Sequence, residues 1–225
     1  LTAAAVEYRT GERSLAALPG GLGAFMAVTA GCAVVASLAI AGVPPLNGFS
    51  SKWLIYATGI LGAKDSTLLP VATLAAMFIS LVTLASFLKY LGGTFLGVPR
   101  KNDPPREVSV SMQVPQIVLA LACLGFGLFP AVPLGFVHQA VASLPSASGV
   151  PELGALLGGG SGLGVARAGI EMAIWAPLPV AGVLVLLGLF CYRGIQRAGD
   201  APIREVQVWT CGEEVRPEEY RYPPG

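Results

Sequence analysis

The chain has 225 residues, of which 54% are hydrophobic and 12% charged, with a net charge of +1 and a mean hydropathy of +0.68. A soluble domain has about a quarter charged residues, so this composition excludes an ordinary soluble protein and favours one that lies in a bilayer. The small net charge gives no support for nucleic acid or an acidic substrate as a partner.

The first residues read as the end of an apolar helix, followed by a polar loop from Glu7 to Arg13. The chain begins with Leu1 rather than Met, and its start shows neither the basic segment nor the cleavage site of a signal peptide. We therefore expect the sequence to be a fragment of a longer subunit.

Long apolar runs follow, and each is long enough to cross a bilayer as a helix. They predict an all-α fold, a polytopic transmembrane helix bundle with about five crossings. The runs are residues 21–42, 42–63, 67–88, 111–137 and 172–192. The expected organisation is a transmembrane bundle over 1–136, a Gly- and Ser-rich outer loop over 137–170, an additional transmembrane helix over 171–193 and a cytoplasmic tail over 194–225.

Helix breakers interrupt the run between residues 42 and 63. Pro44 and Pro45 lack a backbone N–H and Gly48 is conformationally loose, so we expect the helix to break at Pro44-Pro45. Lys52 is an isolated charge in this apolar region. If residues 42–63 form one crossing, Lys52 lies about ten residues, roughly 15 Å, from either end and close to the bilayer midplane.

An ammonium group at that depth is costly, which makes an intramembrane lysine a functional hypothesis. Desolvation and the positive end of a half-helix that starts after the break oppose the charged form, whereas an acidic neighbour or a chain of water molecules favours it. Lys52 can therefore be poised to gain and lose a proton. The alternative is a structural lysine that donates hydrogen bonds to the carbonyl groups left free by the break.

The stretch Gly42-Val-Pro-Pro-Leu-Asn-Gly-Phe-Ser-Ser-Lys52 resembles the signature of the antiporter-like membrane subunits. Respiratory complex I, multi-subunit sodium/proton antiporters and membrane-bound energy-converting (group 4 type) hydrogenases share these proton-conducting subunits. Residues 86–97 and 114–130 are similar to the segments that follow in the hydrogenase branch, to which the resemblance is closest, and the resemblance covers about the first 136 residues. It implies that the chain is a C-terminal portion of such a subunit.

The resemblance implies roles for individual residues. In that family the signature opens a discontinuous helix, and its lysine or glutamate is central to the proton path. This implies a proton-path role for Lys52 and a helix-breaking role for Pro44, Pro45 and Gly48. Lys89 matches a lysine often seen in the family and would be an exit toward the aqueous side, although a lysine at a helix end beside a tyrosine is also typical of an interfacial anchor.

Basic residues set the expected orientation. Four of them between Lys89 and Arg106 place this loop in the cytoplasm by the positive-inside rule, and the arginines after residue 192 place the C-terminus on the same side. Under this count of crossings, Arg9 and Arg13 fall on the outer side, which conflicts with the rule.

The sequence gives no reason to expect a cofactor, a metal or a catalytic residue in this chain. Its four cysteines are far apart and form no Cys-x-x-Cys pair, and no haem or nucleotide motif is present in the sequence. Any electron transfer would therefore take place in another subunit, and the chain would be a non-catalytic part of an oxidoreductase complex.

These features predict a proton- or sodium-translocating subunit of a redox-driven complex, a membrane-bound hydrogenase or a complex I relative. We expect other membrane subunits, peripheral redox subunits and the lipid bilayer as partners, and a prokaryotic-type cytoplasmic membrane as the location. The second hypothesis is a subunit of a multi-subunit sodium/proton secondary antiporter. The third is a structural membrane anchor in which Lys52 is only a bonded residue.

Overall fold

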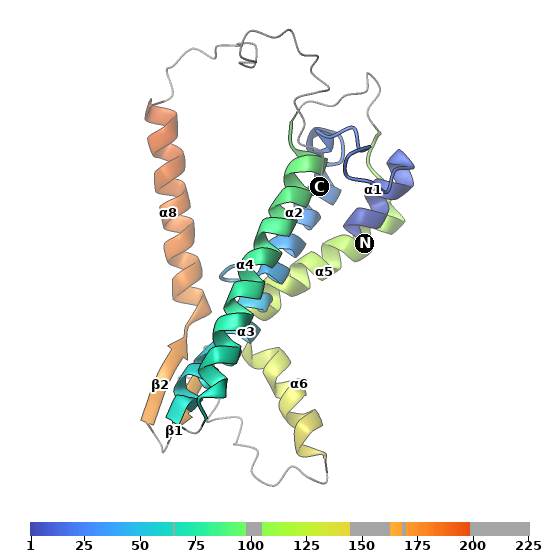
Figure 1. Cartoon of the computed structure of the whole chain (residues 1–225). Coiled ribbons are helices and arrows are strands. Elements are labelled where there is room, and N and C mark those ends of the chain that lie inside the picture. The colour runs from blue at the N-terminus through green and yellow to red at the C-terminus, as the bar shows by residue number, and fades with distance from the viewer. Residues whose placement is uncertain (65, 98–104, 145–162, 168–169, 199–225) are drawn as a thin grey trace, which may run out of the picture.

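The computed structural model of the chain describes residues 1–64, 66–97, 105–144, 163–167 and 170–198. Its helices are α1 (Thr2–Thr10), α2 (Ala27–Ala41), α3 (Asn47–Leu61), α4 (Leu68–Phe95), α5 (Val110–Leu128), α6 (Ala131–Ala142) and α8 (Pro177–Ala198), shown in Figure 1. Two short 3-10 turns, Leu22–Ala24 and Gly62–Lys64, and two strands, β1 (Leu163–Arg167) and β2 (Ile170–Trp175), complete the described elements.

The predicted bundle of membrane helices is confirmed. Within the described ranges, α4, α5 and α8 are long and apolar enough to cross a membrane, and α2 and α6 are shorter apolar helices. The break at Pro44-Pro45 is also present, since α2 ends at Ala41 and α3 begins at Asn47. The chain is therefore an integral membrane protein with a broken helix.

The halves α2 and α3 follow one another along the length of α4. Near the start of α2, Gly21 donates its backbone N–H to the carbonyl of Leu96, 3.0 Å away, at the end of α4. At the other end, Gly59 of α3 packs so closely on Thr73 of α4 that an added Cβ would lie 1.9 Å from the Thr73 Oγ1. A 28-residue helix is about 42 Å long, so α2 and α3 make one traverse beside α4.

This arrangement corrects the predicted side of Arg9. The Arg9 guanidinium donates a hydrogen bond to the backbone carbonyl of Glu107, so α1 and the segment before α5 lie at the same end of the bundle. The sequence count treated residues 21–42 and 42–63 as two crossings, which placed Arg9 on the opposite side. Because the two runs together make one traverse, the conflict with the positive-inside rule disappears.

A second interruption divides the predicted helix 111–137 into α5 and α6. Phe129 leaves the helical conformation, with φ −122° and ψ 65°, and Pro130 follows it. A proline disfavours the helical conformation in the preceding residue, which explains the end of α5 at this point. Pro115, by contrast, lies inside α5.

A small β-hairpin lies where the sequence indicated loop and helix. Strands β1 and β2 pair antiparallel, with Leu163 opposite Trp175, and α8 begins only at Pro177. The segment Ile170–Trp175 combines isoleucine and tryptophan with one acid, a composition that favours a strand, and proline is common at the first position of a helix. The segment expected as an outer loop is thus helical up to Ala142 and partly strand after 162, while 145–162 and the tail 199–225 lie outside the described residues.

The buried apolar cluster of the described chain gathers at the end where α1 packs. It consists of Ala5, Val6, Leu18, Leu22, Met26, Ala33, Leu91, Phe95 and Val108. Most long apolar side chains of α4 and α8 are exposed instead, as expected for faces that meet lipid or neighbouring helices.

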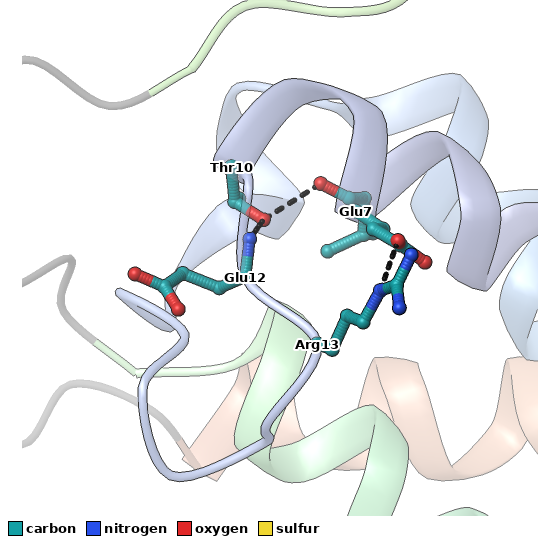
Figure 2. Close-up of polar contacts among 5 residues, drawn as sticks. Glu7, Thr10, Glu12 and Arg13 are labelled. Carbon is teal, nitrogen blue, oxygen red and sulfur yellow. Dashed lines mark hydrogen bonds and ion pairs between the residues drawn. The ribbon is translucent and has the colours of Figure 1, made fainter.

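Polar contacts close the turn after α1, as Figure 2 shows. The Thr10 hydroxyl donates to the Val6 carbonyl at 2.8 Å and accepts from the Glu12 backbone N–H at 3.2 Å. The Glu7 carboxylate accepts a hydrogen bond from Arg13 at 2.6 Å, and this bond together with its charge raises the pKa of Arg13. Arg13 is 86% exposed, so the ion pair adds little stability.

The packing of α5 on the break gives a direct test of the fold. A Cβ on Gly127 would lie 2.2 Å from the carbonyl oxygen of Pro45, so Gly127→Ala should destabilise the protein by about 1–3 kcal/mol. Gly125, in the same helix, has no such neighbour within 4 Å. Gly125→Ala should be neutral or slightly stabilising, because alanine favours the helix. Thermal unfolding in detergent compares the two variants, and equal melting temperatures would contradict the described packing.

Candidate functional site

The last four carbonyl groups of α2 all have hydrogen-bond partners, although the helix ends inside the bundle. The Leu38 carbonyl accepts from the backbone N–H groups of Gly42 at 3.1 Å and Val43 at 3.0 Å, and the Ala39 carbonyl accepts from that of Gly42 at 3.1 Å. Those of Ile40 and Ala41 both accept from the Lys52 ammonium, each at 3.0 Å. A helix leaves four carbonyls without intrahelical partners, and here Lys52 satisfies the two that the turn cannot reach.

The half-buried Lys52 therefore reaches back from α3 to the end of α2. The sequence led us to expect that the positive end of α3 would oppose the charge of Lys52. The structure places the ammonium instead at the carbonyl end of α2, which is the negative end of that helix. The geometry is that of the structural alternative, and it stabilises an ammonium cation in an apolar region by charge-assisted hydrogen bonds.

Two glycines bring the halves of the broken helix close enough for this contact. Gly42 ends α2 with a φ of 82°, a conformation that favours glycine, and the Lys52 chain packs on it: an added Cβ would lie 2.7 Å from Lys52 Cδ. At Gly48 an added Cβ would lie 1.8 Å from the carbonyl oxygen of Ala39. Pro44 and Pro45 lie between these glycines and contribute no backbone N–H.

Contacts with α4 fix the depth of Lys52 in the bundle. Tyr56, one turn after Lys52 in α3, bonds through its hydroxyl to the Ser80 hydroxyl at 2.6 Å, near the middle of α4. Because α3 runs antiparallel to α4, Lys52 lies within about one helical turn of that middle.

A cavity of about 490 Å³ opens beside the first turns of α3. Its wall on α3 includes Asn47, Ser50 and Ser51, and the opposite wall includes apolar residues of α5 and α6 such as Phe126 and Leu134. Most of the lining is apolar, the three polar side chains already have hydrogen-bond partners, and Lys52 is not among the lining residues.

The hairpin is anchored on the same turn of α3. The Trp175 indole N–H donates to the Ser50 hydroxyl at 3.1 Å, and the Trp175 and Phe49 ring centroids are 4.4 Å apart. Both members of the hydrogen bond are buried, with exposed fractions of 6% for Trp175 and 5% for Ser50. Sequence reasoning missed this contact, because a tryptophan just before an apolar helix does not reveal a partner 125 positions away.

Lys89 lies apart from this arrangement. It is exposed on the last turns of α4, and no hydrogen bond links it to Lys52 within the part of the chain that the structure describes. Its position suits both readings of the sequence, the interfacial anchor and the exit toward an aqueous face.

We expect the bond between Trp175 and Ser50 to stabilise the junction by about 1 kcal/mol. Trp175→Phe keeps a ring against Phe49 but leaves the buried Ser50 hydroxyl without its donor. The loss in free energy of unfolding caused by Trp175→Phe should therefore be smaller in a Ser50→Ala background. Trp53, half-buried in the same helix, has no hydrogen-bond partner among the described residues, and Trp53→Phe is the control. Denaturant unfolding of the double-mutant cycle measures the coupling, and strictly additive losses would show that the bond contributes nothing.

No protein-family model matches the chain, but it is similar to subunits of antiporters and of formate hydrogenlyase. It is 40% identical over 151 residues to the A/B subunit of a probable K⁺/H⁺ antiporter from Rhizobium meliloti, covering 64% of this chain and 15% of the relative. It is 32% identical over 143 residues to the A1 subunit of a Na⁺/H⁺ antiporter from Staphylococcus saprophyticus, and the match covers 60% of this chain and 18% of that relative. It is 33% identical over 131 residues to formate hydrogenlyase subunit 3 of Escherichia coli, and the match covers 55% of this chain and 21% of that relative.

Both the antiporter and the hydrogenase branches are thus represented among the relatives, and the chain spans only about a fifth or less of their length. The expected resemblance is confirmed at the level of the superfamily. The chain is similar to a portion of these antiporter and hydrogenlyase subunits.

Proposed function

We propose that this chain forms part of an ion-translocating subunit of a multi-subunit membrane complex, and that Lys52 exchanges a proton at the helix break. The observation that supports this most is the position of Lys52, whose ammonium is held by two carbonyl groups near the middle of the bundle. An ionisable residue at that depth is by default a candidate for a proton relay.

The hydrogen bonds of Lys52 suggest how protonation and structure are connected. An ammonium has three N–H donors, of which Ile40 and Ala41 use two, so the third can meet a water molecule or an acidic group. Charge-assisted hydrogen bonds are roughly twice as strong as neutral ones. Loss of the proton would therefore weaken the contact between α2 and α3. Pro44 and Pro45 keep this junction non-helical. Gly48, predicted as part of the break, lies instead in the first turn of α3 and allows its close approach to α2. Lys89 would lead the proton toward an aqueous face.

The driving force would come from other subunits. We favour a redox-driven complex related to membrane-bound hydrogenases or complex I, with peripheral redox subunits and a prokaryotic-type cytoplasmic membrane, which the relationship to formate hydrogenlyase subunit 3 supports. The 40% identity to a K⁺/H⁺ antiporter protein favours a second candidate, a secondary antiporter that exchanges cations for protons without redox chemistry.

Replacing Lys52 separates proton exchange from the structural role. Arginine can still donate to the Ile40 and Ala41 carbonyls but does not lose its proton at accessible pH. Lys52→Arg should therefore assemble like the wild type and yet lower ion translocation by about a hundredfold or more, the scale of a lost proton-transfer group. Lys52→Ala should lose translocation and also stability, because two carbonyls lose their donors.

The measurement is ion translocation by the intact complex in sealed vesicles, with redox turnover recorded in parallel. Turnover and pumping that fall together would support the redox-driven complex, and loss of gradient-driven exchange without any redox dependence would support the antiporter. Normal translocation by Lys52→Arg and Lys52→Ala would refute the proton-exchange role and leave the structural anchor. Lys89→Ala tests the exit in the same vesicles, where an unchanged rate would make Lys89 an interfacial anchor only.

A further inference from the structure

Glu107 binds the first turn of α2, whereas Lys52 binds the last carbonyl groups of the same helix. The half-buried carboxylate of Glu107 accepts hydrogen bonds from the backbone N–H groups of Val28 at 2.9 Å and Thr29 at 3.2 Å, and from the Thr29 hydroxyl at 2.6 Å. Val28 and Thr29 belong to the first turn of α2, where N–H groups lack intrahelical partners. A carboxylate there also lies at the positive end of the helix.

No side chain just before α2 in the sequence accepts hydrogen bonds from the N–H groups of its first turn. The residue before the helix is Met26, which makes no side-chain capping bond, and Thr29 is 0% exposed, so water cannot easily replace a lost partner. The cap comes instead from a residue almost eighty positions later, before the start of α5.

The segment that bears Glu107 is itself fixed. Arg9 of α1 donates to the Glu107 backbone carbonyl, and the Gln113 side chain of α5 donates to the next carbonyl, that of Val108, at 2.6 Å. The Glu107 carboxylate also accepts from the Val108 N–H at 3.1 Å. The carboxylate is therefore held by α1 and α5 and can act as a rigid stop for α2.

We propose that Glu107 is a positioning residue for Lys52. An α-helix transmits an axial displacement along its length, because each turn is hydrogen-bonded to the next. The position of the Ile40 and Ala41 carbonyls, and so of the ammonium they bind, depends on where Glu107 fixes the other end of α2. The expected effect of Glu107 on ion translocation rests on the proposed function. The anchoring of α2 by Glu107 does not, and it can be tested by itself.

The anchoring is tested through Cys32, which lies one turn after Thr29 on α2 and is 9% exposed. In the full-length protein within its complex, with Cys123, Cys191 and Cys211 replaced by serine, the rate of reaction with N-ethylmaleimide is followed over a range of pH and compared at equal thiolate fraction, so that the direct effect of the Glu107 charge on the thiol is removed. The corrected rate reports how often this turn opens. Glu107→Gln and Glu107→Ala should raise the rate about tenfold, the change expected when a hydrogen bond to a charged group is lost. Glu107→Asp, which keeps the carboxylate, should restore a rate near that of the wild type.

Glu12→Gln is the matched control. Glu12 is an acid at the same end of the bundle, but Figure 2 shows its carboxylate directed away from the Glu7 and Arg13 pair, and no hydrogen bond to this carboxylate is found among the described residues. Neither labelling nor translocation should change in this variant. Glu107→Gln should lower translocation, and Glu107→Asp should restore it.

The link to Lys52 is tested by combining variants. If Glu107 acts through α2, Glu107→Gln should lower translocation no further in a Lys52→Arg background, whereas independent effects would multiply. Multiplied losses, or translocation that falls while Cys32 labelling stays unchanged, would overturn the proposal. Raised labelling with normal translocation would also overturn the link to Lys52. Failure of the proposed function is seen separately, as translocation that survives Lys52→Ala.

Discussion

The need to satisfy backbone carbonyls within an apolar environment governs this structure. A helix that ends in the middle of a membrane bundle exposes carbonyl groups that water cannot reach freely, and each unsatisfied group there costs several kcal/mol. Gly42 and Val43 satisfy two of them through the backbone, and Lys52 satisfies the other two. The lysine and the break therefore depend on each other: without the break the carbonyls would be paired within the helix, and without the lysine the break would be costly.

The same constraint explains the small residues around the break. Gly48 lets the start of α3 meet the carbonyl of Ala39, and Gly127 lets α5 cross over Pro45. A side chain at Gly48 would move α3 away from the end of α2 and lengthen the hydrogen bonds of Lys52, and one at Gly127 would separate α5 from the break. Trp175 packs on the next turn of α3, so the hairpin and the start of α8 are attached beside the same junction. Helix α5 and Trp175 of β2 thus pack beside the break, whose residues 42–45 are half-buried, whereas most large apolar side chains of α4 and α8 are exposed.

Local signals allowed the sequence to predict part of this. Apolar runs indicated the membrane helices, and two prolines with a glycine indicated the break, because both depend on residues close together in the chain. The contacts of Glu107 with Thr29 and of Trp175 with Ser50 join residues 78 and 125 positions apart, and no local pattern indicates them. The hairpin was missed because Ile170–Trp175 is apolar enough to read as the start of a crossing, and the side of Arg9 was wrong because two short helices in series were counted as two crossings.

The structural and the functional interpretations of Lys52 do not exclude one another. A hydrogen bond to a charged group contributes about 1.5–3 kcal/mol, so the two bonds of the ammonium connect its protonation to the packing of α2 on α3. A lysine that only relayed protons through water would leave the helices unaffected by its charge. A lysine that closes a helix end changes the free energy of that contact each time it is protonated. An ion-translocating protein needs such a connection, because moving charge in one direction requires that protonation and conformation depend on each other.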